Sequence, residues 1–327
     1  MKRALVTGGA GFVGNWIVRT LLERGVEVRV LAKEGERLDN LDGLTVEVVR
    51  GDVLSPADAR RAVADMDTVF HAAAIYDAWA PNPRMMYTVN LEGTFHMLQA
   101  AREVGATVVY TASIAALGRP EPGRVGDETL AYEAWEVDFS YSRAKYFSMR
   151  TALNYAAWGM DVRVVCPGIV FGPHDLRPTP SGGLILALLR GQARGYFEGG
   201  ATYVDVRDAA LAHVLAAERG KAGEIYIATG HNLDNRAFID LAARVAGVKV
   251  PAVKIPTPVA RLVLTAYEAR AARTGVAPPI SKTFMEYGLK PAFYSSAKAE
   301  RELGATFRPL EETVADAIAD FRRRGVV

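Results

Sequence analysis

Short apolar runs alternate with amphipathic stretches along the first half of the chain. Six runs have the length and composition of buried strands: 3–7, 26–31, 45–49, 67–72, 107–112 and 162–166. Four stretches between them have helical spacing: 12–24, 56–64, 89–104 and 141–158. Because strands that alternate with helices form parallel sheets covered on both faces, we expect an α/β fold with a doubly wound parallel sheet.

The pattern changes after Pro173, where loops interrupt it. A strand, a helix and a second strand then return, and the remainder of the chain is mostly helical in pattern. We therefore predict a dinucleotide-binding domain and a smaller, mostly helical C-terminal substrate lobe. The domain would comprise residues 1–172 and 204–230, and the lobe residues 173–203 and 231–327.

Composition excludes several classes of function. The net charge is +2, with 39 basic and 37 acidic residues well mixed, so no basic stripe suggests nucleic acid. The one cysteine, Cys166, lies in an apolar run without metal-ligand spacing. No stretch reaches the ~18 apolar residues of an integral membrane segment, and we expect a cytoplasmic protein. The amphipathic stretch 258–273 is expected to pack over a site, with contact to a membrane or a partner left open.

A glycine-rich turn, TGGAGFVG, follows the first expected strand and opens the first expected helix. Gly8 allows a tight turn there, Gly11 lets the backbone approach a pyrophosphate, and Gly14 lets helix and strand pack closely. The helix N-terminus adds a partial positive charge for phosphate oxygens. The turn therefore predicts a Rossmann domain that binds a dinucleotide.

The glycine spacing and later motifs resemble the extended short-chain dehydrogenase/reductases, the NAD-dependent epimerase/dehydratase family. GDV at 51–53 ends the third strand, HAAA at 71–74 ends the fourth, and NLEGT at 90–94 opens a helix. The resemblance implies that Asn90 is structural. It also implies cofactor contacts around the turn and the strand ends, from Phe12, Val13, Asp52, Val53, Ala72, Ala73, Ala74 and Pro167.

Two longer stretches narrow the resemblance. YDAWAPNPRMMYTVNLEGT at 76–94 and GPHDLRPTPSG at 172–182 are similar to the hopanoid-associated sugar epimerases, which neighbour the dihydroflavonol reductases and the 3β-hydroxysteroid dehydrogenases. The resemblance covers nearly the whole chain and implies an NAD(P)-dependent enzyme. The family's name is a poor guide to its chemistry, so it does not identify the substrate.

Two tyrosine–lysine pairs compete for a catalytic role, YSRAK from position 141 and YSSAK from position 294. Tyr141 and Lys145 begin a stretch without Pro or Gly and share one face of the expected helix. Tyr294 lies before the serines that would cap its helix, so the second pair shares no face. Only the first pair follows a strand that ends in a serine, Ser113. We expect Ser113, Tyr141 and Lys145 to be catalytic and YSSAK to be structural.

Hydride transfer to a carbonyl leaves an alkoxide that needs a proton, and the reverse reaction needs a base. A free tyrosine titrates near ~10, too high for a base at neutral pH. An ammonium at ~4 Å in an effective dielectric of ~20 contributes about 4 kcal/mol, or about 3 pKa units. We therefore expect Lys145 to lower the pKa of Tyr141, and Ser113 to hydrogen-bond the reacting oxygen. The resemblance implies that Lys145 also holds the nicotinamide ribose.

The end of the second strand bears on the choice of cofactor. Ala32 stands where NAD sites usually carry an acidic residue for the ribose hydroxyls. Lys33 follows it and Arg37 lies nearby, and basic side chains can pair with a 2′-phosphate. We expect NADP(H), held by Lys33 and Arg37. Solvated Lys33 and Arg37, with Glu34 at the ribose of NAD(H), is the alternative.

Three functions remain open: a reductase or dehydrogenase for an apolar carbonyl or alcohol, a nucleotide-sugar epimerase, and a non-catalytic dinucleotide-binding protein. Nucleotide-sugar relatives usually carry an Arg for the diphosphate at the position of Ala201, and we expect the nearby Arg207 at the start of a helix instead. An apolar substrate is therefore favoured, with a terpenoid or steroid-like skeleton as one option. The expected substrate-binding residues are Tyr76, Trp79, Ser113, Ile114 and Ile169.

Helices 89–104 and 141–158 carry apolar residues on more than one face, including Phe147, Leu153, Tyr155 and Trp158. In the family that the chain resembles, these two helices pair across a two-fold axis as a four-helix bundle. We therefore expect a homodimer.

Overall fold

The computed structural model describes residues 1–76, 82–133, 139–193, 195–250, 253–276 and 281–327. Its main sheet has seven strands in the order β10-β7-β5-β4-β1-β2-β3, all parallel. They are β1 (Arg3–Thr7), β2 (Glu27–Ala32), β3 (Glu47–Arg50), β4 (Thr68–His71), β5 (Thr107–Thr111), β7 (Val162–Pro167) and β10 (Ile225–Ala228). The predicted doubly wound sheet is confirmed. Its strand order reverses between β1 and β4, which is where such sheets bind ligands.

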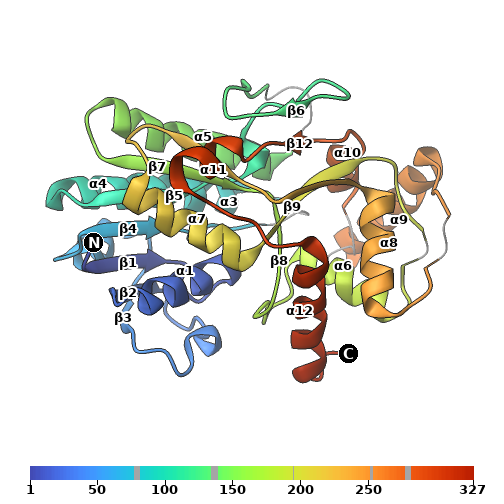
Figure 1. The fold of residues 1–327 in the computed structure, drawn as a ribbon, viewed down its shortest axis with the longest axis horizontal. Coiled ribbons are helices and arrows are strands. Elements are labelled where there is room, and N and C mark those ends of the chain that lie inside the picture. Colours follow the sequence, from blue (N-terminus) through green and yellow to red (C-terminus); the bar gives the residue numbers. More distant parts are fainter. Residues whose placement is uncertain (77–81, 134–138, 194, 251–252, 277–280) are drawn as a thin grey trace.

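Helices cover both faces of this sheet (Figure 1). One face carries α2 (Pro56–Val63), α4 (Thr94–Val104) and α5 (Ser140–Ala157). The other carries α1 (Phe12–Glu23), α7 (Val206–Arg219) and α11 (Ala297–Leu303). Because both faces are covered, the strands are continuous apolar runs, and Leu5, Val69 and Val109 are fully buried. Each such side chain contributes roughly 1.5–3 kcal/mol of transfer free energy.

The helix expected at 89–104 is irregular and starts earlier. It comprises α3 (Arg84–Tyr87), a π-helical segment η2 (Thr88–Gly93) and then α4. Asn90 lies in the π turn, and its amide pairs with both backbone groups of Ile75, at 2.8 Å and 3.0 Å. The expected helix at 89–104 is confirmed, with a π turn at its start that was not predicted, and the structural role of Asn90 is confirmed.

The second lobe is built on a three-stranded sheet in the order β11-β9-β8. The strands are β8 (Ile169–Phe171), β9 (Gly200–Asp205) and β11 (His231–Asp234), and they share a core with α6 (Pro180–Leu189), α8 (Asn235–Ala246) and α12 (Leu310–Arg323). A smaller cluster joins α9 (Thr257–Thr274) to α10 (Lys282–Gly288). A short pair, β6 (Val125–Gly126) and β12 (Phe293–Tyr294), completes the sheets. The division of the chain into two units stays a prediction. The strand β8 lies within the predicted dinucleotide-binding range 1–172, yet it pairs with β9 in the three-stranded sheet.

Candidate active site

The glycine turn between β1 and α1 has no room for side chains at two positions. Gly8 has a φ of +69°, and a Cβ there would lie 2.8 Å from the backbone nitrogen of Ala73. A Cβ at Gly14 would lie 2.0 Å from the carbonyl oxygen of Gly8. No side chain among the described residues caps α1, so its first N–H groups, at Phe12 and Val13, remain available to an anion. This cradle fits the phosphates of a dinucleotide.

A buried network holds the segment after β4 against the glycine turn. The hydroxyl of Thr7 accepts from the N–H of Ala73 at 3.1 Å and lies 2.8 Å from Nδ1 of His71. The other ring nitrogen, Nε2, lies 3.1 Å from the hydroxyl of Thr94, which itself donates to the carbonyl of Asn90. Nε2 therefore carries the proton and Nδ1 accepts from Thr7. Burial lowers the pKa of His71 to about 3, so the ring is a neutral link between β1, β4 and α4.

The three expected catalytic residues lie around the carboxyl end of β5. Ser113 directly follows this strand and caps the short 3-10 helix η3 (Ile114–Ala116), accepting from the N–H of Ala115 at 3.1 Å. Tyr141 lies in the first turn of α5, and the side chain of Ser113 lies near enough to affect its pKa. Lys145 is one turn further along, and its Nζ donates to the carbonyl of Thr111 at 2.8 Å. The end of β5 thus receives both the tyrosine and the lysine of YSRAK.

Burial dominates the electrostatics of this site. It raises the pKa of Tyr141 to about 12, although the hydrogen bond with Ser113 acts in the opposite direction. It also lowers the pKa of Lys145, which is 4% exposed, to about 8. The expectation that Lys145 lowers the pKa of Tyr141 is wrong for the chain itself, because withdrawal from water outweighs any nearby charge. A tyrosine with a raised pKa keeps its proton at neutral pH and can donate it.

A second buried histidine steadies the backbone that holds Lys145. The hydroxyl of Thr111 lies 3.0 Å from Nε2 of His213, and Nδ1 of that ring lies 2.7 Å from the carbonyl oxygen of Ala209. Since a carbonyl only accepts, Nδ1 carries the proton and Nε2 accepts from Thr111. Burial lowers the pKa of His213 to about 4, so it stays neutral. The sequence analysis did not single out this residue, since a lone histidine in an alanine-rich helix carries no local signal.

The expected adenosine-binding residues are paired with acids. Nζ of Lys33 lies 3.2 Å from the carboxylate of Asp52, the residue expected at the adenine. The guanidinium of Arg37 lies 2.6 Å from the carboxylate of Asp39. Val53 follows Asp52 and is buried. The remaining expected contacts lie at strand ends on the same edge of the sheet, with Ala72, Ala73 and Ala74 after β4 and Pro167 ending β7.

A pocket lies beside the glycine turn, lined by Ala10, Arg37, Asp39, Asn40, Leu176 and Arg177. Asn40 is 6% exposed and donates to the carbonyl of Ala10 at 3.0 Å. Its Oδ1 has no hydrogen-bond partner within the part of the chain that the structure describes. Arg177 comes from the loop between β8 and α6, where the sequence analysis expected no cofactor contact. The pocket therefore combines two guanidinium groups with an unused buried acceptor.

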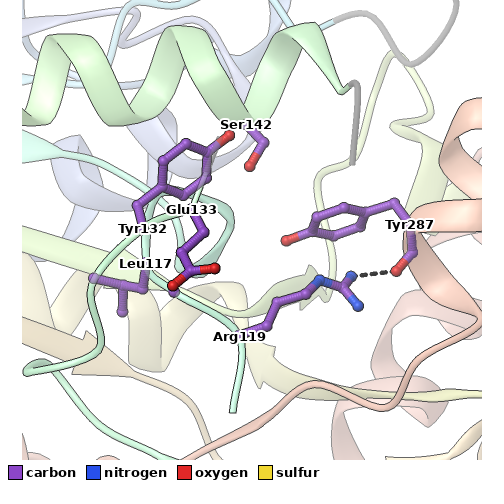
Figure 2. A pocket seen from close by; sticks show the side chains of 7 residues that line it. Leu117, Arg119, Tyr132, Glu133, Ser142 and Tyr287 are labelled. Carbon is purple, nitrogen blue, oxygen red and sulfur yellow. Dashed lines mark hydrogen bonds between the residues drawn. The ribbon is translucent and has the colours of Figure 1, made fainter. Parts of the chain in front are cut away.

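A second pocket lies next to the catalytic residues (Figure 2). Its lining residues are Leu117, Gly118, Arg119, Tyr132, Glu133, Ser142 and Tyr287. The guanidinium of Arg119 lies 4.1 Å from the ring centre of Tyr287 and donates to the backbone carbonyls of Tyr287 and Lys290. Its Nε is buried and has no partner among the described residues. The sequence analysis missed this polar wall, because Tyr287 and Lys290 reach it from the distant end of the chain.

The expected substrate residues take different places around Tyr141. Tyr76 packs edge-to-face on Tyr141, with ring centres 4.5 Å apart. Phe139, which we did not predict, also packs here: its ring centre lies 5.8 Å from that of Tyr141 and 5.0 Å from that of Tyr287. Ile114 packs against the sheet core and Ile169 against the core of the second lobe. Trp79 lies outside the described residues.

The second tyrosine–lysine pair is structural, as predicted. Tyr294 is 1% exposed in β12, and its hydroxyl donates to the carbonyl of Gly118 at 2.9 Å. Lys298 binds the carboxylate of Glu224 and the carbonyl of Ile225. The helix α11 begins only after Tyr294, with Ser296 as its N-cap.

The region expected to hold a diphosphate in nucleotide-sugar relatives is occupied by a closed ion-pair cluster. Arg207 lies in the first turn of α7, as expected. Its guanidinium binds the carboxylate of Asp205 at 2.9 Å and 2.8 Å and lies 2.6 Å from that of Asp316. Ala201, in β9, supplies no cation. The charge of Arg207 is therefore already matched by carboxylates.

Residues 4–228 match the family described as NAD dependent epimerase/dehydratase. A Synechocystis sp. protein named as a dihydroflavonol 4-reductase is 33% identical over 327 residues, covering 98% of this chain and 95% of that protein. The sterol demethylase protein B of Methylococcus capsulatus is 29% identical, with 99% of each covered. The crystal structure of gox2253 superimposes with a TM-score of 0.88 at 36% identity, over 99% of both chains.

Proposed function

Because the chain belongs to the NAD dependent epimerase/dehydratase family, as an extended short-chain dehydrogenase/reductase, we propose that it interconverts a carbonyl and an alcohol on an apolar substrate with NADP(H). The observation that carries the proposal is that Ser113 directly follows β5, while Lys145, one helical turn beyond Tyr141 on α5, is buried and donates to the carbonyl of Thr111 at the end of the same strand. A cytoplasmic location and a homodimer stay predictions.

Each catalytic side chain has a distinct task. The bound nicotinamide supplies or accepts the hydride. Tyr141 holds a proton at neutral pH, because burial raises its pKa to about 12, and can pass it to an alkoxide oxygen. Ser113 offers a hydroxyl to the same oxygen and fixes the direction of the tyrosine hydroxyl. Lys145, anchored on the carbonyl of Thr111, places its nitrogen beside the first turn of α5.

The preference for NADP(H) rests on the pocket beside the glycine turn. Arg37 and Arg177 line it from two different loops, and guanidinium groups suit the planar recognition of phosphate oxygens. The unpartnered Oδ1 of Asn40 can accept a hydrogen bond from a ribose hydroxyl. Lys33 adds a third cation at the end of β2, although Asp52 holds it at 3.2 Å. The cations of Arg37, Arg177 and Lys33 favour a 2′-phosphate, whereas Oδ1 of Asn40 suits a ribose hydroxyl of either cofactor.

The preference for an apolar substrate rests on the aromatic side chains around the catalytic tyrosine. Tyr76 and Phe139 both contact Tyr141, and Tyr287 extends the layer. The relatives named above carry the names of enzymes for dihydroflavonols and sterols, which are fused-ring molecules. The unpartnered Nε of Arg119 can bind an oxygen at the far end of such a molecule.

A screen of steroid, flavonoid and terpenoid ketones, aldehydes and alcohols, followed by NADPH absorbance, tests the proposal. At least one apolar carbonyl should be reduced, and calorimetric titration with UDP and UDP-glucose should show no binding below millimolar concentration. Burying a diphosphate without a paired cation is expensive, and Arg207 is already matched by Asp205 and Asp316. Micromolar binding of UDP-glucose, with no turnover of the apolar panel, would establish the epimerase instead.

A further inference from the structure

The helix α9 exposes an apolar surface to solvent. Only Ala260, Leu264 and Ala271 of its 18 residues are buried. Val259, Leu262, Val263 and Tyr267 are 51%, 74%, 44% and 42% exposed. At 100° per residue they lie on one arc of the helix, which adjoins the arc of the buried Ala260, Leu264 and Ala271. An apolar patch of this kind marks an interaction site more often than a solvated surface.

Two arginines share this face. At 100° per residue, Arg270 and Arg273 fall among Val259, Leu262 and Val263. Neither arginine has an ion-pair partner in the described part of the chain. The one acid of the helix, Glu268, lies toward the inner side and accepts from the N–H of Lys282 at 2.8 Å. The exposed face is thus apolar and cationic, with no carboxylate of its own.

We propose that α9 docks the protein on an anionic lipid bilayer. In a helix that lies in the plane of a membrane, apolar side chains sit at the boundary between headgroups and acyl chains, and the long side chains of arginines can reach the headgroups. Arg270 and Arg273 then meet anionic headgroups, and Tyr267 has the amphipathic ring typical of that depth. Among the described residues no helix is long and apolar enough to cross a membrane, so this is contact with one leaflet surface.

A second copy of the chain is a poorer occupant. It would have to offer carboxylates to Arg270 and Arg273 within an apolar patch. Exposed aromatic side chains lie on α4 and at α5, as Phe95, Phe147 and Trp158, and the one acid of these two helices, Glu103, is already paired with Arg60. Figure 1 places α4 at the opposite end of the molecule from α9.

Contact of α9 with a bilayer would place the membrane near the catalytic pocket. Leu264 of α9 packs with Met285 of α10. From α10, Tyr287 lies 5.0 Å from Phe139, which contacts Tyr141. An apolar substrate dissolved in the bilayer would meet the protein on this side. This step alone rests on the proposed function, whereas the docking does not.

Sedimentation of the purified full chain with phospholipid vesicles, without cofactor or substrate, tests the docking. We expect binding to phosphatidylcholine vesicles that contain phosphatidylglycerol, little binding to phosphatidylcholine alone, and weaker binding in high salt. Leu262→Glu should abolish it. Arg270→Gln with Arg273→Gln should weaken it about thirtyfold, which corresponds to about 1 kcal/mol for each arginine.

The matched controls are Leu184→Glu, an exposed leucine on α6, and Arg124→Gln with Arg301→Gln, exposed arginines elsewhere. Both should bind vesicles like the unmutated chain. Equal binding by Leu262→Glu, or no binding by the unmutated chain, would overturn the proposal. So would loss of self-association in Leu262→Glu without a change in vesicle binding, which would assign α9 to a second copy. A chain that docks but reduces no apolar carbonyl would leave the docking intact and refute the proposed function.

Discussion

The hydroxyl of Tyr141 is the group on which the proposed chemistry depends. Tyr141→Phe removes the proton donor and the partner of Ser113, while the glycine turn and the adenosine pocket are untouched. We expect kcat to fall about 10²–10⁴-fold, with the Kd of NADPH within a few-fold of the unmutated value. Stopped-flow turnover and fluorescence titration measure the two quantities.

Tyr294→Phe is the matched control. It removes the hydrogen bond to the carbonyl of Gly118, which is buried, and should cost about 1–3 kcal/mol of stability. Turnover should stay within a few-fold because Tyr294 lies outside the catalytic group. A dead Tyr294→Phe variant beside an active Tyr141→Phe variant would reverse the assignment.

Lys145 makes stability depend on pH. Its pKa is lowered from an ordinary value of 10.5 to about 8 by burial, so the unfolded chain binds the proton more tightly. Stability should therefore rise with pH between about 8 and 10.5, and the cost of burying the charge is fully present below that window. From pH 7 to 9.5 the unmutated chain should gain about 2 kcal/mol relative to Lys145→Met.

Urea unfolding of both proteins across this range measures the difference, and comparison with the variant cancels the other titrating groups. Equal pH profiles would show that burial does not lower the pKa of Lys145.

At the scale of elements, the cofactor preference belongs to two loops rather than to one residue. Arg37 follows β2 and Arg177 precedes α6, and the two line one pocket. We expect NADP to bind more tightly than NAD. Arg37→Ala, Arg177→Ala and Lys33→Ala should each narrow that gap by weakening NADP binding, with little effect on NAD, because only NADP carries the 2′-phosphate.

Titration of intrinsic fluorescence with each cofactor measures the four sets of Kd values. Arg301→Ala, in α11, is the matched control and should change neither the Kd of NADP nor the Kd of NAD. Equal Kd values for NADP and NAD in the unmutated chain would refute the preference. A preserved gap in Arg177→Ala alone would limit the phosphate site to the loop after β2.

The elements that sequence could predict are those whose signal is local. The strands of the main sheet and the helices α1, α5 and α7 follow from periodicity, and the turn at Gly8 and Gly14 follows from spacing, whereas β6, β8, β11 and β12 were not predicted. The π turn at Asn90 could not be foreseen, since its cause is a contact with Ile75. The positions of Arg177 in the cofactor pocket and of His213 beside Thr111 could not be predicted for the same reason, because the residues near them in the fold lie far away in the sequence. The pKa of Tyr141 was misjudged because a pairwise charge estimate omits burial.

At the scale of the whole molecule, α4 and α5 form a surface that one subunit does not cover. Phe95, Phe147 and Trp158 are 48%, 45% and 66% exposed. Tyr155, by contrast, is buried. Its hydroxyl donates to Oε1 of Gln99 at 3.0 Å, and this hydrogen bond links α5 to α4. An exposed apolar patch on two adjacent helices suits a two-fold contact with the same two helices of a second copy of the chain.

We therefore expect a homodimer at micromolar concentration. Trp158→Glu or Phe147→Glu should yield monomers, since each would place a charge in the apolar contact without disturbing the core of the subunit. Leu262→Glu, on α9, is the control and should stay dimeric, because the proposed membrane surface and the dimer surface lie on different elements. Light scattering coupled to size exclusion measures the masses. A monomer mass for the unmutated chain would rule the dimer out, and the exposed rings of α4 and α5 would then need another partner.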